Sequence, residues 1–196
     1  PGFLVEDPKW ARPFPGSHMA PPTGGILALY NRGDRRLFYW RCPQCENPFE
    51  PDFNLLSIPD SADFVEAGEA TVMVCPHCTY PIPHDYDDRY GFKGKYDMNL
   101  GGRWVPEGMA WEKNGELSGK RMRSDIASFW LKGVCAAFAD WKTLVINYKK
   151  AEQEYEETGS ETALKTTVNT DQGRAYTPKS LTEGRTIEML KELVVQ

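Results

Sequence analysis

The sequence predicts an α+β protein, in which a zinc-ribbon-like β element with extended loops precedes a C-terminal helical subdomain. Two Cys-x2-Cys pairs each follow a short run of β-forming residues, which is the pattern of a metal-binding ribbon. The segments around these pairs are rich in proline and glycine, as turns and extended loops are. Beyond residue 140 the apolar residues recur with helical spacing instead.

Residues 1–41 are expected to form an extended arm and a β-hairpin. Proline and glycine signals crowd the first 25 residues and favour an extended path over a neighbouring surface. Apolar β-formers at 26–30 and 37–40 flank "NRGDR", which predicts a hairpin with Gly33 at its turn.

Residues 42–111 are expected to form the zinc-ribbon-like segment. "CPQC" is followed by an acidic polar insert at 46–70, a short strand at 70–74 and then "CPHC". Residues 80–102 look like loop, and 103–111 like a strand that Pro106 interrupts.

Residues 112–196 are expected to be mainly helical. The apolar run at 125–134 fits a buried strand or a helix start equally well. Residues 140–159 predict an amphipathic helix with Asp140 as N-cap and Gly159 as stop. A second helix is expected after Ser160, and a third within 181–196. No internal repeat is expected.

The charge distribution argues against a dedicated DNA-reading domain. The net charge is −5, but residues 1–41 carry +3 and residues 42–100 carry −8. Nucleic-acid-binding domains usually show a basic excess, and the acidic block should repel a phosphate backbone. No apolar run approaches the roughly 18 residues of a membrane span, and no secretion signal is seen.

The cysteine pairs predict a structural metal site. Each pair has the spacing of a knuckle that aims two thiolates at one ion, and four thiolates form the preferred closed shell of structural zinc. The predicted Zn²⁺ ligands are Cys42, Cys45, Cys75 and Cys78. The 29 residues between the pairs exceed the usual gap of about 15–20, which a looped-out insert would explain.

Rival interpretations of the cysteines are weaker. A thioredoxin-type redox pair needs a helix start in an α/β unit, and disulfides need an oxidising compartment. Iron takes the same four ligands, so spacing leaves it open. His77 is expected to be an exposed knuckle residue, and Cys135 a small buried hydrophobe.

Three arginines are candidate phosphate contacts. Arg32, Arg35 and Arg36 lie close together in "NRGDRR", where they could contact a phosphate or form a solvated turn paired with Asp34. Both interpretations stay open. The acidic run at 85–88 is expected to be an exposed loop. No phosphate loop, dinucleotide fingerprint or catalytic residue is found in the chain.

The order of the segments resembles a known family. "GILALYNRGDRRLFYWRCPQCENPFEP", "VMVCPHC", "GRWVPEG", "ASFWLKGV" and "LKTTVNTDQGRAY" follow one another as in the middle of the large terminase subunits of lambda-type tailed bacteriophages and prophages. The resemblance implies a DNA-packaging motor with an ATPase upstream, using ATP and Mg²⁺, and a metal-dependent nuclease beginning beyond Gln196. It also implies double-stranded DNA, the small terminase subunit and the portal or procapsid as partners, in the host cytoplasm.

The expected function is therefore a structural zinc-binding connector between the ATPase and nuclease domains, inactive by itself. The alternative is a stand-alone zinc-ribbon module that binds nucleic acid or docks a protein. A third class is an electron-transfer protein with iron in the same four sulfurs.

Overall fold

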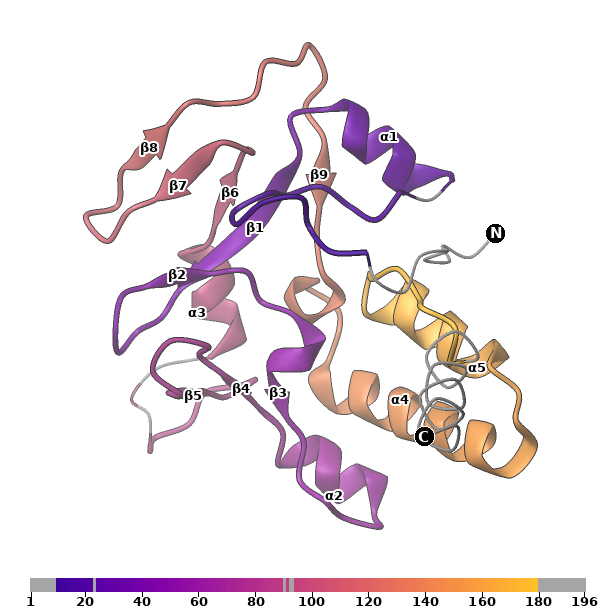
Figure 1. Ribbon diagram of the computed structural model, residues 1–196. Coiled ribbons are helices and arrows are strands. Elements are labelled where there is room, and N and C mark those ends of the chain that lie inside the picture. Colours follow the sequence, from indigo (N-terminus) through magenta and orange to yellow (C-terminus); the bar gives the residue numbers. More distant parts are fainter. Residues whose placement is uncertain (1–9, 23, 90, 92–93, 180–196) are drawn as a thin grey trace, which may run out of the picture.

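The computed structural model describes residues 10–22, 24–89, 91 and 94–179, and it shows an α+β fold, as expected (Figure 1). The helices of the described part are α1 (Ile26–Arg32), α2 (Phe64–Glu69), α3 (Lys95–Leu100), α4 (Trp141–Thr158) and α5 (Thr162–Thr166). Two 3-10 turns, η1 (Phe53–Leu55) and η2 (Gly133–Cys135), and one π-helical turn, η3 (Thr167–Asp171), complete the helical elements.

The strands form three small sheets in the described part of the chain. They are β1 (Arg36–Arg41), β2 (Pro48–Phe49), β3 (Leu56–Ser57), β4 (Val72–Val74), β5 (Pro81–Ile82), β6 (Arg103–Val105), β7 (Met109–Trp111), β8 (Leu117–Gly119) and β9 (Phe129–Trp130). The central strand β1 pairs antiparallel with β2 and β6, and parallel with β9. Strands β3, β4 and β5 form the second sheet, and β7 and β8 form a separate hairpin.

The hairpin expected over 26–40 is wrong, because 26–32 folds as helix α1. Leu27 and Tyr30 are buried while Ile26 and Leu29 are exposed, so the apolar run follows a helical rather than an alternating period. Strand β1 finds its partners far along the chain instead. Leu37 lies opposite Val105 on β6 and beside Trp130 on β9.

The segments expected to be insert and loop contain regular structure. Within 46–70, β3 pairs with β4, and α2 packs against α4. Within 80–102, α3 carries Lys95, which is 4% exposed and donates to the carbonyl oxygens of Ala136 (2.6 Å) and Ala139. Lys95 thus supplies hydrogen-bond donors to two carbonyl groups of a distant loop. The sequence pattern does not reveal this long-range contact.

The C-terminal half follows the prediction more closely. Asp140 accepts a hydrogen bond from the Lys142 N–H at the start of α4, and Gly159 ends the helix in the left-handed conformation (φ 71°). Helix α5 begins one residue later than expected, although Ser160 Oγ accepts from the Thr162 N–H (3.4 Å). The third helix, predicted within 181–196, lies outside the described residues.

One large core joins these elements. It contains residues of the ribbon strands, of α3, of η2 and of α4, and its largest fully buried side chains are Trp40 and Trp141, whose ring centroids lie 6.4 Å apart. The segment after η3 docks on η2, where the Gly133 N–H donates to the Gln172 carbonyl (2.9 Å). Among the described helices, none is both long and apolar enough to cross a membrane.

Candidate metal centre

Two equivalent hairpins carry the two cysteine pairs. The first is β1–β2, where Trp40 lies opposite Phe49; the second is β4–β5, where Met73 lies opposite Ile82. All four of these side chains are buried in the large core. Each Cys-x2-Cys pair therefore occupies the tip of a hairpin whose base is anchored by an apolar pair.

The hairpins share a sequence repeat that the sequence analysis missed. Both read Cys-Pro-x-Cys-x-x-Pro followed by an apolar residue, over 42–49 and 75–82. Glu46 and Thr79 occupy the same position and both adopt positive φ, at 60° and 61°. Their N–H groups donate 2.9 Å hydrogen bonds to the carbonyls of the first cysteine of each pair. The expectation of no internal repeat is thus wrong at the scale of eight residues.

The four cysteine sulfurs converge on one point. The Sγ atoms of Cys42 and Cys78 are 3.6 Å apart, those of Cys45 and Cys75 are 3.8 Å apart, and all four lie within 4.8 Å of one another. Four sulfurs arranged tetrahedrally at the Zn–S distance of about 2.3 Å would lie about 3.8 Å apart. The geometry therefore fits a single tetrahedral metal ion. A disulfide is excluded, because its sulfurs would lie about 2.05 Å apart.

Hydrogen bonds to sulfur prepare the site for negative charge. The His77 N–H donates to Cys75 Sγ (3.4 Å), and the Asn47 side-chain amide donates to Cys45 Sγ (3.5 Å). Burial raises the pKa of Cys42 to about 12. Burial also acts to raise the pKa of Cys45, but hydrogen bonds from the Asn47 backbone and the neighbouring thiols outweigh it and lower that pKa to about 6. Four thiols this close cannot all ionise without a compensating cation.

The rival cysteine interpretations find no support in the geometry. Neither pair opens a helix, as a thioredoxin-type redox pair would. His77 is exposed, and its Nε2 lies 3.2 Å from the Pro48 carbonyl oxygen. Cys135 is buried in the core (4% exposed) and stands outside the cysteine cluster, as expected.

The three candidate phosphate arginines have different surroundings. Arg36 Nε lies 2.9 Å from Asp34 Oδ2, and Arg35 forms an ion pair with the buried Glu107. Asp34 is itself fully buried and also binds Arg121 (2.5 Å). Arg32 is exposed at the end of α1. The turn thus contains the internal Asp34 pair, and phosphate contact by these arginines stays a prediction.

Comparison with protein families identifies the chain. A model described as the ATPase domain of the phage terminase large subunit gpA matches residues 7–104, which is half of the chain. The chain belongs to the phage terminase large subunit family. A second model, described as the endonuclease domain of the terminase large subunit gpA, matches residues 126–193. Comparison with curated proteins and with solved structures finds no match.

The two matches correct one expectation about this terminase. We expected the nuclease to begin beyond Gln196, whereas the endonuclease match begins at residue 126. The ATPase match, in turn, takes in both cysteine pairs. Strand β1 belongs to the ATPase match and β9 to the endonuclease match, yet they are neighbours in one sheet. The boundary between the two matches is therefore not a boundary of the fold.

Proposed function

We propose that this part of the terminase large subunit is a structural metal-binding connector, with Zn²⁺ held by Cys42, Cys45, Cys75 and Cys78. The observation that carries the proposal is the convergence of four sulfurs at tetrahedral spacing. With four protein ligands such a site has no open position, so its role is structural rather than catalytic.

The connector role follows from where the site is anchored. The first hairpin continues β1, which also pairs with β6 and β9, and Trp40 packs against Trp141 of α4. A bound ion would cross-link the two hairpins and make this assembly rigid. Movement in the ATPase region would then reach the nuclease region through packed structure instead of through a flexible linker.

In the whole protein we propose that ATP and Mg²⁺ serve the ATPase and nuclease, which act on double-stranded DNA together with the small terminase subunit and the portal or procapsid in the host cytoplasm. We assign no catalytic residue to this part of the large subunit. The stand-alone ribbon module is less well supported. Strand β1 lies in the ATPase match and its neighbour β9 lies in the endonuclease match, so the ribbon shares a sheet with the part of the chain that matches the second enzyme domain.

The test is metal content together with stability. The purified chain should contain one zinc per molecule and be colourless, whereas a red protein would indicate iron. Cys45→Ser should lose the metal and lower the free energy of unfolding by about 4 kcal/mol or more. This is only part of the binding free energy of a structural zinc ion, which is roughly 10–16 kcal/mol. For a protein of this size, a loss of about 4 kcal/mol corresponds to a fall in Tm of about 10 °C.

Cys135→Ser is the matched control, because it removes a buried thiol outside the cluster. It should keep its zinc. The proposal fails if the wild-type chain is equally stable before and after chelation, or if both variants retain the metal.

A further inference from the structure

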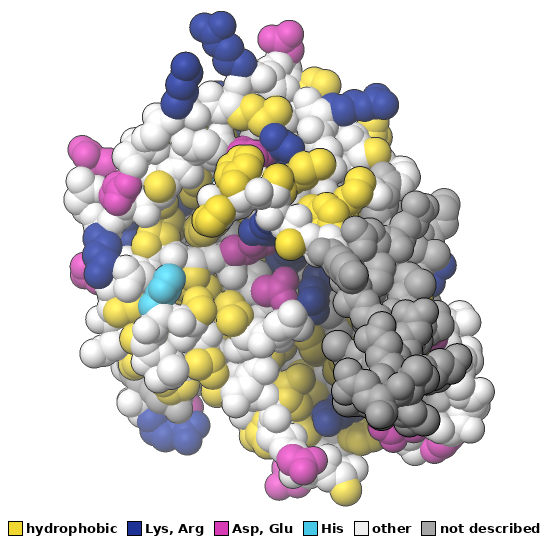
Figure 2. Space-filling view, in the orientation of Figure 1, with side chains coloured by type: hydrophobic (Ala, Val, Ile, Leu, Met, Phe, Trp, Pro, Cys, Tyr) yellow, Lys and Arg dark blue, Asp and Glu magenta, His cyan; other side chains and the backbone are white. Residues whose placement is uncertain are grey.

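A pocket with more basic than acidic side chains lies at the end of β9. It has a volume of about 250 Å³, and its charged lining residues are Arg12, Asp52, Lys132 and Arg174, with Trp10, Trp130 and Thr177 among the others. Figure 2 shows basic and acidic side chains gathered in a hollow over the region of β9 and η2, with hydrophobic side chains around it.

Two carboxylates lie at this pocket, Asp52 in its lining and Glu50 next to it, and each forms an ion pair with an arginine. Arg12 Nη2 lies 2.8 Å from Glu50 Oε2. Arg174 Nε lies 3.5 Å from Asp52 Oδ1, and its Nη1 donates to Asn54 Oδ1 (2.8 Å). Three cations thus face two carboxylates, a surplus of one positive charge. Lys132 shares Glu50 with Arg12, and the Glu50 Oε1 atom on its side has no hydrogen-bond partner.

Lys132 is a buried ammonium whose ion pair with Glu50 is too long to be a hydrogen bond. The residue is 7% exposed, and its Nζ is 3.8 Å from Glu50 Oε1, beyond hydrogen-bonding distance. No acceptor within hydrogen-bonding distance of Nζ is found among the described residues. Burial lowers the pKa of Lys132 to about 8, so the group is still charged at neutral pH. A largely buried ammonium is costly unless acceptors or water complete its hydrogen bonds, so an anion in the pocket would lower that cost.

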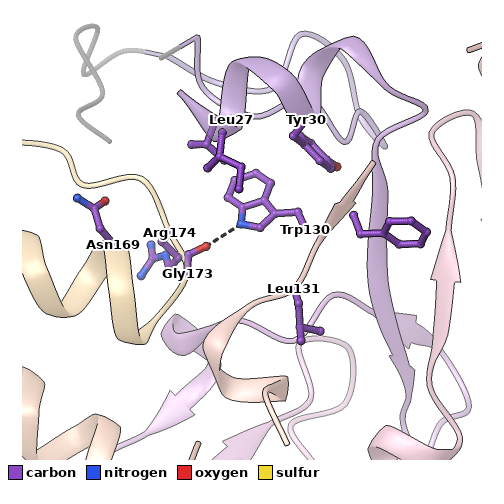
Figure 3. A pocket seen from close by; sticks show the side chains of 9 residues that line it. Leu27, Tyr30, Trp130, Leu131, Asn169, Gly173 and Arg174 are labelled. Atoms are coloured by element: carbon purple, nitrogen blue, oxygen red, sulfur yellow. Dashed lines mark hydrogen bonds between the residues drawn. The ribbon is translucent and has the colours of Figure 1, made fainter. Parts of the chain in front are cut away.

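The walls of the pocket are held in place. Lys132 Nζ sits 3.4 Å from the centroid of the Trp130 ring, and Trp130 Nε1 donates to the Gly173 carbonyl (2.7 Å; Figure 3). The indole of Trp130 also lines an apolar pocket of about 230 Å³, together with Leu27 and Tyr30 of α1 (Figure 3). The ammonium is therefore pre-positioned, which reduces the entropy lost when a ligand binds.

We propose that this pocket binds a phosphate group, with Lys132 as the central ligand and Arg12 and Arg174 at its sides. Phosphate offers several acceptor oxygens to an ammonium and matches the planar fork of arginine. The group could be a diester of the DNA backbone or the terminal phosphate of a free nucleotide, which present the same oxygens to the pocket. None of the four clustered cysteines lines this pocket.

The experiment titrates the folded chain with inorganic phosphate, ATP or a short DNA duplex, and follows binding by calorimetry and tryptophan fluorescence. Lys132→Met should weaken the binding of whichever probe binds the wild-type chain by about 10–100-fold. This fold-change corresponds to the loss of one charge-assisted hydrogen bond of about 1.5–3 kcal/mol. Lys113→Met removes the same charge from the exposed β7–β8 turn and should leave affinity unchanged. Zinc content and circular dichroism establish that the variants are folded.

Thr177→Glu provides a second test that leaves Lys132 in place, since a carboxylate at the pocket should repel phosphate and weaken binding similarly. Binding of DNA alone would assign the site to the backbone diester, and competition by ATP or inorganic phosphate would assign it to a terminal phosphate. The proposal is overturned if none of the three probes binds. It is equally overturned if folded Lys132→Met binds as wild type does, which would make Lys132 only the counter-ion of Glu50.

Discussion

Gly133→Ala tests whether the end of η3 and the residue after it dock on η2 as closely as the structure shows. An added Cβ at Gly133 would lie 1.7 Å from the Asp171 carbonyl oxygen, 2.8 Å from its carbonyl carbon and 3.1 Å from Gln172 Cα. All three are backbone atoms, so no side chain can rotate to make room. Residues 171–172 must move away, and the hydrogen bond from the Gly133 N–H to the Gln172 carbonyl is lost.

The expected cost follows from these two effects. Forcing an extra methyl into a packed contact costs about 1–3 kcal/mol, and the lost hydrogen bond costs about 1 kcal/mol. Alanine has less conformational entropy than glycine in the unfolded chain, and this stabilises the folded variant by less than about 1 kcal/mol. We therefore expect a loss of about 2–4 kcal/mol, which corresponds to a fall in Tm of about 5–15 °C for a chain of this length.

The assay is urea unfolding followed by circular dichroism and tryptophan fluorescence. Gly101→Ala is the matched control, because Gly101 has helical backbone angles (φ −83°, ψ −6°) and its Cβ would meet only the Asp97 carbonyl oxygen at 3.4 Å. Its stability should change by less than about 0.5 kcal/mol. If Gly133→Ala unfolds at the wild-type urea concentration, the close docking of 171–172 on η2 is refuted.

Two further predictions concern buried lysines. Lys95→Met leaves the carbonyls of Ala136 and Ala139 without their donor, and we expect it to lower the free energy of unfolding by about 2 kcal/mol, whereas exposed Lys150→Met should change it by less than about 0.5 kcal/mol. Equal urea midpoints for the two variants would contradict this role. Lys132 has a pKa of about 8 when folded against 10.5 as its ordinary value, so the unfolded chain binds more protons between these pH values. The stability of wild type relative to Lys132→Met should therefore rise by about 3 kcal/mol from pH 8 to 10.5, and a flat difference would speak against the shift.

The convergence of the four cysteines was predictable because metal-binding knuckles have a local sequence signature. Two cysteines with two residues between them can bind one ion only through a tight turn. Each Cys-x2-Cys pair therefore predicts a knuckle without any knowledge of the fold. Helix α4 was predictable for a similar reason, since its cap at Asp140, its apolar face and its stop at Gly159 all lie within one short segment.

The elements that the sequence did not reveal depend on contacts between distant residues. Ile26–Tyr30 is too short to distinguish a helical from a strand period, and β1 pairs with residues more than 60 positions away. Helix α2 is stabilised by packing on α4, and α3 by the reach of Lys95 across the core. The repeat in the two hairpins is hard to predict from sequence, because its two copies are short and differ at the positions between the shared residues.

The pairing of β1 with β9 has a practical consequence for dissecting terminases of this kind. A cut placed between residues 104 and 126, where the two family matches leave a gap, would separate β1 from its parallel neighbour and Trp40 from Trp141. Either piece would expose an apolar surface that the other normally covers, and would tend to aggregate when expressed alone. Half-proteins for separate study of the two enzymatic activities are better divided outside the part of the chain that shares this core.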